Sequence, residues 1–154
     1  MWSTPGRARS ISRMPLPVSD VLLDAARAND HIAYELINGW SYSPGKQLGG
    51  NQVPGMWLMG SGMRLMERTR PGVLYTDLAA CHAWADGLTA AAAARCPTLL
   101  LLGARDLMAP PKGAPALIAA LADPRVVTLP DCGHALMAEQ PDAVLDALAA
   151  FLPA

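Results

Sequence analysis

The hydrophobic pattern of this chain changes character near Pro97. Before that point, apolar residues recur three and four positions apart, the spacing of helices with one buried face. A stretch over residues 41–55 is dense in Gly, Pro, Ser and Asn, and this composition predicts a loop. We expect a first helix from residue 18 with Ser19 as its N-cap, and further helices over about 32–40, 63–70, 73–84 and 88–95.

After Pro97 the apolar residues form two continuous short runs, over 98–102 and 126–129. Such runs are typical of strands buried on both faces of a parallel sheet. Helices are predicted over 110–122 and 141–152, so the order is strand, helix, strand, helix, which indicates a right-handed parallel crossover. Two strands alone make a marginal sheet, and we therefore expect its other strands outside this chain. The last helix has one predicted buried stripe, formed by Val144, Leu145, Leu148, Ala149 and Leu152.

Composition narrows the class of protein. The 154 residues are 52% apolar and 16% charged, which suits one domain with a buried core. A net charge of −1 argues against a nucleic-acid or anionic-membrane partner, and no apolar run is long enough for a transmembrane helix. Cys81, Cys96 and Cys132 are too far apart for a disulfide framework or a CxxC site, and His31 and His82 lack a partner at metal-ligand spacing. We expect a cytoplasmic protein with reduced thiols, no metal and no cofactor.

The N-terminal residues 1–17 contain Arg7, Arg9 and Arg13 and no acidic residue. They lack the apolar core of a secretory signal and the amphipathic stripe of a transit peptide. We therefore expect a disordered leader over 1–17. A further hypothesis is that Met14 is the first native residue and that residues 1–13 come from a false start or a misread frame.

Each predicted strand is followed by a titratable residue: Asp106 after the first and His134 after the second. Because the carboxyl ends of parallel strands meet at one edge of a sheet, we expect these two side chains to lie close together. A carboxylate that binds one imidazole nitrogen fixes the tautomer and leaves the other nitrogen as a general base. The alternative is that Asp106 is a turn residue and His134 a loop histidine.

Two segments, PTLLLLGARDLMAP (97–110) and VVTLPDCGHALMAEQPDAVLDALAAFL (126–152), resemble the C-terminal part of the α/β-hydrolase family. The resemblance implies an α/β fold in which the last two parallel strands and their flanking helices follow a helical cap. It divides the chain into the leader, a cap over 18–88 and a core part over 89–154. It also implies that Asp106 is the acid and His134 the base of a Ser-His-Asp triad.

The family's nucleophile motif G-x-S-x-G is absent from this sequence. The nearest serine is Ser61 in Met59-Gly60-Ser61-Gly62-Met63, where methionine occupies both outer glycine positions and would clash in a tight elbow. Too few residues separate Ser61 from Asp106 for both another strand and a cap. We therefore interpret Ser61 as a loop or helix-cap serine, with the nucleophile as the alternative.

The resemblance implies a hydrolase of esters or related small apolar substrates, to which this chain contributes only the acid and the base. The chain would then be inactive alone, and its N-terminal half would be missing. Trp57, Met59 and Met63 either line an apolar substrate pocket or pack the cap against the core. A different class of function is also open: a non-catalytic remnant or module that self-associates or binds another subunit through an exposed sheet edge.

Overall fold

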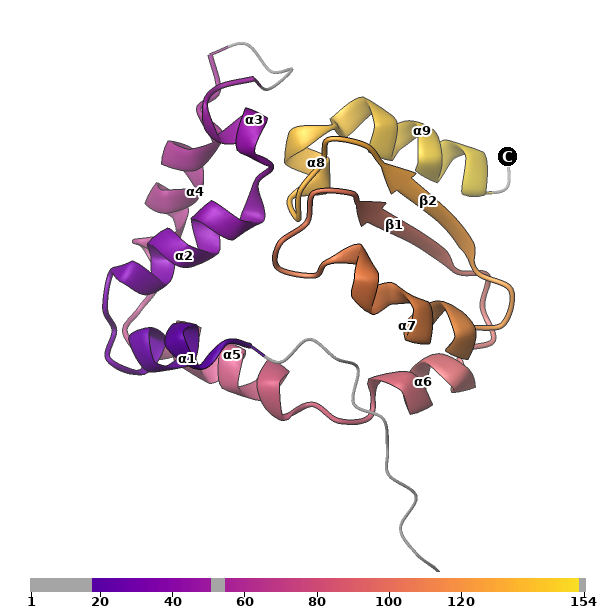
Figure 1. The fold of residues 1–154 in the computed structure, drawn as a ribbon, viewed down its shortest axis with the longest axis horizontal. Coiled ribbons are helices and arrows are strands. Elements are labelled where there is room, and N and C mark those ends of the chain that lie inside the picture. Colours follow the sequence, from indigo (N-terminus) through magenta and orange to yellow (C-terminus); the bar gives the residue numbers. More distant parts are fainter. Residues whose placement is uncertain (1–17, 51–54, 153–154) are drawn as a thin grey trace, which may run out of the picture.

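The computed structural model describes residues 18–50 and 55–152, so the predicted leader lies outside the described residues. Helices make up the first half of the described chain, and a small sheet with its own helices follows (Figure 1). The elements are α1 (Asp20–Arg27), α2 (Ile32–Ser41), α3 (Pro44–Gln47), α4 (Leu58–Met66), α5 (Val73–Ala83), α6 (Gly87–Ala93), β1 (Leu99–Gly103), η1 (Pro111–Gly113), α7 (Ala114–Ala120), β2 (Arg125–Leu129), α8 (Leu136–Glu139) and α9 (Pro141–Phe151).

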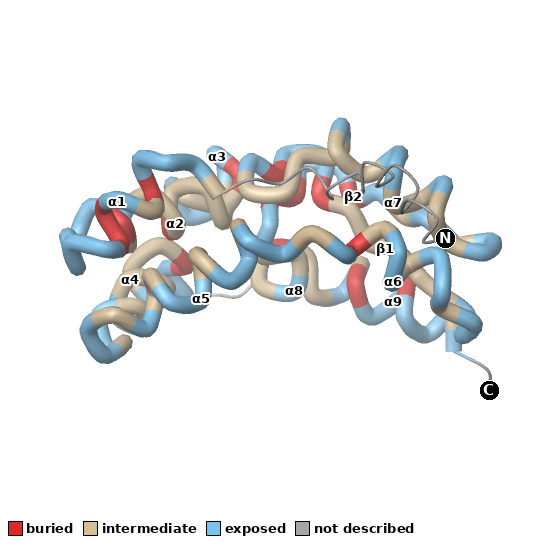
Figure 2. Tube along the Cα trace, turned by 90° about the horizontal axis from the view of Figure 1, so that it is seen from below, coloured by how far each residue is buried: buried red, intermediate tan, exposed pale blue. Residues whose placement is uncertain are grey.

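Strands β1 and β2 pair in parallel, in a register that runs from Leu99 opposite Arg125 to Gly103 opposite Leu129. The crossover between them contains η1 and α7, which confirms the predicted strand–helix–strand unit. Helix α9 packs on the sheet face that presents Leu101 and Val127. Figures 1 and 2 place α7 on the opposite face from α9. The fold is therefore the α/β class that the sequence predicts.

The prediction that both strands are buried on both faces is wrong for this structure. Along the two strands only Gly103 and Leu129 are buried, while Arg125, Val126 and Thr128 are exposed. The reason is that the described sheet contains two strands, so each strand has one edge that no other strand covers. Helix cover on two faces does not bury a sheet that is so narrow.

The predicted buried stripe of the last helix is also largely wrong. Val144 and Ala147 are the buried residues of α9, whereas Leu145, Leu148 and Leu152 are 64%, 40% and 60% exposed. The helix is apolar around most of its circumference, and a two-stranded sheet contacts only one narrow face of it. Periodicity alone could not decide which face that is. The three leucines define an exposed surface that we call the α9 leucine face.

The helical half has a small core of its own. Leu22, Ala25 and Ala26 of α1 and Ala33 of α2 are buried, and partly buried side chains of α2 and α5 pack against them. Ser19 caps α1 by accepting a hydrogen bond from the Leu22 N–H at 3.3 Å, as predicted.

Several helices differ from the sequence prediction. The predicted loop over 41–55 contains α3, which begins at Pro44, where the missing proline N–H costs no helical bond. Helix α4 begins at Leu58 rather than near residue 63, because Leu58 is buried and the Asn38 side chain donates to the Met59 carbonyl at 2.8 Å. The predicted helix over 110–122 is divided between η1 and α7, and the one-turn α8 was not predicted. In the described residues no helix has the length and apolarity needed to span a membrane.

His31 joins the start of α2 to the end of α4, a contact that sequence spacing missed. Its Nδ1 lies 3.2 Å from a carboxylate oxygen of Glu35, and its Nε2 lies 3.1 Å from one of Glu67. A carboxylate only accepts, so both ring nitrogens act as donors when the imidazole is charged. The hydrogen bonds to Glu67 and then to Glu35 raise the pKa of His31 above its ordinary value.

We predict that this contact stabilises the fold more at low pH than at high pH. Because the folded pKa of His31 is raised, its contribution is fully present below the unfolded value of about 6.5 and is lost as pH rises through the folded pKa. The measurement is urea unfolding of the wild type and His31→Gln. The difference in unfolding free energy between them should be larger at about pH 5.5 than at about pH 8.5. A difference that does not change with pH would contradict this assignment.

Candidate active site

Asp106 lies in the loop that follows β1, and both of its carboxylate oxygens are held. Oδ1 accepts hydrogen bonds from the backbone N–H groups of Met108 and Ala109, each at 2.8 Å. Oδ2 lies 2.9 Å from Nδ1 of His134. The side chain is only 6% exposed, so its orientation is set by these partners rather than by water. The loop thus presents one oxygen, in a fixed position, to the histidine.

His134 follows β2 through a short turn, and its ring is 44% exposed. Its backbone N–H donates to the Ser41 carbonyl at 2.9 Å, which ties the histidine to the end of α2. An ionised carboxylate accepts only, so the contact with Asp106 selects the tautomer that carries its proton on Nδ1. Nε2 is then an acceptor, and none of the described residues forms a hydrogen bond to it. The structure therefore brings the two sequence-predicted residues together as an acid–imidazole pair.

The two strand-end loops approach closely because glycine occupies both contact points. A Cβ atom at Gly103 would lie 2.1 Å from the Gly133 carbonyl oxygen, a distance that backbone atoms cannot relieve. Next to this contact, the Ala104 N–H donates to the Leu129 carbonyl at 3.0 Å and the Arg105 N–H donates to the Cys132 carbonyl at 2.8 Å. The backbone that follows β1 is thus hydrogen-bonded to the turn that carries His134.

One carboxylate beside this pair was not predicted from the sequence. Glu139, at the end of α8, is fully buried and accepts hydrogen bonds from Gly133 and Ser43. The available signal was a single acidic residue inside the apolar segment 135–139. Sequence reasoning missed it because its donors include a residue far away in the chain.

Ser61 lies inside helix α4, and its backbone N–H donates to the Trp57 carbonyl at 2.9 Å. The interpretation of Ser61 as a loop or cap serine is therefore wrong, because the helix already begins at Leu58. Among the described residues no strand leads into this helix, and this part of the chain therefore shows no nucleophile elbow at Ser61. Ser61, Trp57 and Met63 do line one surface hollow, together with the charged Arg64 and Glu67, whereas Met59 is not part of its lining.

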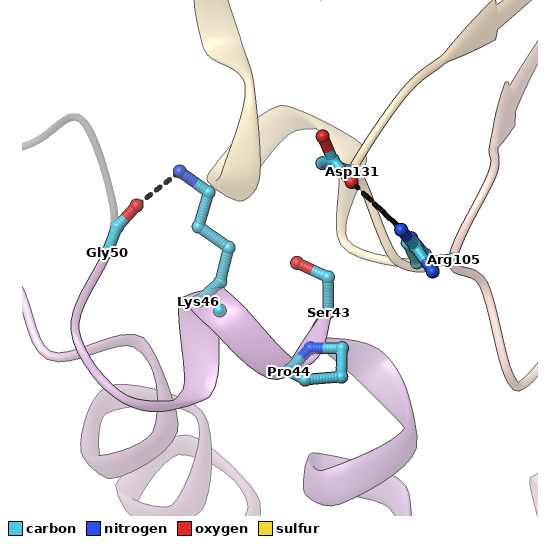
Figure 3. Close-up of a pocket in the computed structure, with 7 residues that line it drawn as sticks. Ser43, Pro44, Lys46, Gly50, Arg105 and Asp131 are labelled. Carbon is cyan, nitrogen blue, oxygen red and sulfur yellow. Dashed lines mark hydrogen bonds and ion pairs between the residues drawn. The ribbon is translucent and has the colours of Figure 1, made fainter.

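Two other cavities flank the loops that carry the acid–imidazole pair. One, of about 230 Å³, is apolar and includes Leu107 and Met108, which directly follow Asp106. Its remaining lining comes from α1, α2, α5 and the residues before α1, namely Val18, Ser19, Leu22, Trp40 and Leu78. The other, of about 440 Å³, has the charged residues Lys46, Arg105 and Asp131 in its lining and lies between α3 and the two strand-end loops (Figure 3). Within the described ranges, no cluster of His, Cys, Asp and Glu is arranged to hold a metal ion.

Cys132 lies two residues before His134 and is fully buried among Leu129 and Val144. Burial, and then the nearby charges of Glu139 and Asp106, raise the pKa of its thiol to about 11. A thiolate is the reactive form of cysteine, so this residue is unreactive at neutral pH. Cys81 and Cys96 are exposed.

We predict that Cys81 and Cys96 react rapidly with a thiol reagent in the folded chain and that Cys132 does not. At about pH 8 only about a thousandth of the Cys132 thiol is ionised, and burial blocks access to it. The measurement is labelling of a Cys81→Ser, Cys96→Ser double variant with Ellman's reagent, before and after adding denaturant. Rapid labelling of this folded variant would show that Cys132 is not buried.

This chain is similar to a known protein family and to several solved structures. The family model described as alpha/beta hydrolase family matches residues 5–147. Among solved structures, the enol-lactonase from Burkholderia xenovorans LB400 aligns with a TM-score of 0.72 and 22% identity over 85% of this chain and 48% of its own. The thermophilic esterase from Thermogutta terrifontis aligns with a TM-score of 0.69 and 21% identity, over 87% of this chain and 50% of its own. The esterase EaEST from Exiguobacterium antarcticum aligns with a TM-score of 0.71 and 13% identity, over 86% of this chain and 46% of its own.

A search of curated proteins gave no match. The chain spans about half the length of the structures it resembles, and at these identities the likeness shows the fold alone. The family match, by contrast, extends over most of the chain and includes both Asp106 and His134. This chain therefore belongs to the alpha/beta hydrolase family.

Proposed function

We propose that this chain provides the acid and the base of a Ser-His-Asp triad in a hydrolase of esters or related small apolar substrates. The observation that carries the proposal is the 2.9 Å contact between Asp106 Oδ2 and His134 Nδ1 at the ends of two adjacent parallel strands. Family membership supports it, and so do the esterases and the lactonase among the similar structures.

In this mechanism Nε2 of His134 accepts the proton of a serine hydroxyl while the serine oxygen attacks the carbonyl carbon of the substrate. The imidazolium then donates that proton to the leaving oxygen, which releases the alcohol and leaves an acyl-enzyme. Water repeats the two steps and releases the acid. Two backbone N–H groups hold the second oxygen of Asp106, so its carboxylate is in place to stabilise the imidazolium.

The serine and the oxyanion-binding groups would come from a segment outside this sequence. Two observations support this part of the proposal: Ser61 lies within a helix, and the chain spans about half of the similar structures. The acid and base alone do not break an ester at a useful rate, since the nucleophile is the group that they activate.

Residues 18–88 would form the cap of this site, and the apolar cavity beside Asp106 would hold part of the substrate. The cavity is lined by Leu22 and Trp40 on one side and by Leu107 and Met108 on the other. These residues replace Trp57, Met59 and Met63 as the proposed substrate pocket, because the hollow at Trp57 and Met63 is partly charged. An apolar wall favours an uncharged acyl or alkyl group.

We predict that the isolated chain does not turn over a p-nitrophenyl ester. A protein extended by the coding sequence upstream of Met14, read in the frame that contains a G-x-S-x-G motif, should be active. In that protein His134→Ala and Asp106→Ala should each lower kcat by about 10³-fold or more, because His134 activates the nucleophile and Asp106 orients and stabilises His134. Asp146→Ala, which removes an exposed acid of α9, is the control and should change kcat little. Turnover by the isolated chain that His134→Ala abolishes would overturn the proposal.

A second function rests on different surfaces. Among the described residues no further strand pairs with the outer edges of β1 and β2, and the α9 leucine face exposes apolar side chains. These are the features of a module that binds a further strand or subunit. In the absence of another partner, a second copy of the chain would occupy them.

If this second function is correct, the isolated chain should self-associate. Light scattering after size-exclusion chromatography should give a mass above the 16.2 kDa monomer that rises with concentration. Leu145→Glu together with Leu148→Glu should shift the equilibrium toward the monomer, because charge opposes association of an apolar face. A chain that remains monomeric at every concentration and melts in one cooperative step would argue against this function.

A further inference from the structure

Glu139 is a buried acid whose role the triad does not explain. Its side chain is fully buried, and in the described part of the chain no cation forms an ion pair with it. A buried carboxylate is costly unless donors surround it. Here three donors do: Oε2 accepts from the Ser43 N–H at 3.1 Å and from the Ser43 hydroxyl at 2.5 Å, and Oε1 accepts from the Gly133 N–H at 2.9 Å.

These bonds join two segments that are far apart in the sequence. Ser43 precedes α3 in the helical half, and Gly133 directly precedes His134. On the other side of the same junction, the Ser41 carbonyl accepts from the N–H groups of His134 and Ala135, each at 2.9 Å. The backbone around His134 is therefore held by Glu139 before the histidine and by Ser41 at the histidine itself.

The junction is also closely packed. A Cβ atom at Gly133 would lie 2.7 Å from both Glu139 Oε1 and the Ser43 nitrogen, so no other side chain fits there without displacing them. Figure 3 shows Ser43 on α3's side of the cavity of about 440 Å³, facing the loops that carry Arg105 and Asp131. Those two residues form an ion pair with a closest separation of 3.3 Å. The turn that carries His134 is thus held against both β1's loop and the helical half.

We propose that Glu139 is a positioning residue, which through Gly133 and Ser43 holds the His134 ring where its Nδ1 meets Asp106. The inference rests on the proposed function of the Asp106–His134 pair and adds the element that fixes its geometry. Glutamine at this position keeps the shape but offers one acceptor oxygen and an N–H₂ group. At least one of the three donors would then face another donor, and the turn before His134 would shift to avoid that contact.

The test is the tautomer of His134 in the full chain, which needs no catalytic activity. Long-range ¹H–¹⁵N correlation spectra at about pH 8.5, above the ordinary imidazole titration, distinguish a proton on Nδ1 from one on Nε2. His134→Gln identifies the signal among the three histidines. The wild type should hold its proton mainly on Nδ1. In Glu139→Gln the ratio of the Nδ1–H to the Nε2–H form should fall by about two-fold or more.

Three variants separate the outcomes. Asp106→Ala should lose the Nδ1–H preference; a wild type without any preference would refute the acid–base pair itself, and with it the proposed function. Val144→Ala removes buried apolar atoms from the same part of the core, so it lowers stability without removing any hydrogen bond of the junction and should leave the ratio unchanged. A preference that Asp106→Ala abolishes but Glu139→Gln leaves intact would overturn the role of Glu139 alone.

Ser43→Ala supports the test if Glu139→Gln does not fold. This variant loses the hydrogen bond from the Ser43 hydroxyl to Glu139 and keeps the one from the Ser43 backbone N–H. The ratio of the Nδ1–H to the Nε2–H form should therefore fall, by a smaller factor than in Glu139→Gln. Equal ratios in Ser43→Ala and the wild type would then overturn the proposal. If Val144→Ala shifts the ratio as much as the junction variants do, the effect is general loosening of the fold and the proposal is likewise wrong.

Discussion

The candidate site depends on the parallel pairing of β1 and β2. Because both strands end at the same edge, in the register that sets Gly103 beside Leu129, the loops that follow them start side by side. The absence of a side chain at Gly103 then lets the two loops come into backbone contact. Antiparallel pairing of the same strands would put Asp106 and His134 at opposite ends of the sheet. The chemistry of the pair is in this sense a consequence of strand direction.

Two buried carboxylates complete this arrangement, and they act in different ways. Asp106 uses one oxygen for the backbone of its own loop and the other for His134, so it orients a ring. Glu139 uses both oxygens for donors of two separate segments, so it connects backbones. Neither is paired with a lysine or arginine among the described residues. Hydrogen bonds from fixed donors replace a counterion in each case, and such bonds specify geometry more than they add stability.

The sequence predicts those features whose cause is local. The short apolar runs, the Ser19 cap and the crossover all follow from neighbouring residues, and the edge shared by Asp106 and His134 follows from the crossover. The buried face of α9 could not be predicted, because apolar residues cover most of the helix and the sheet selects Val144 and Ala147 rather than the leucines. Helix α4 includes Gly60 and Ser61 because packing of Leu58 overrides local propensity. The buried role of Glu139 could not be predicted, because one of its partners, Ser43, lies in the other half of the molecule.

The contacts that place Asp106 against His134 do not depend on how well the sheet is buried. Every contact that orients Asp106 and His134, from the Met108 N–H to the Ser41 carbonyl, is made within the described residues. The exposed strand edges and the α9 leucine face, by contrast, have apolar or unpaired groups that these residues do not cover. A two-stranded sheet with such surfaces is only marginally stable by itself. A segment that covered these surfaces would therefore contribute mainly burial, while the position of Asp106 relative to His134 is already determined by contacts among the described residues.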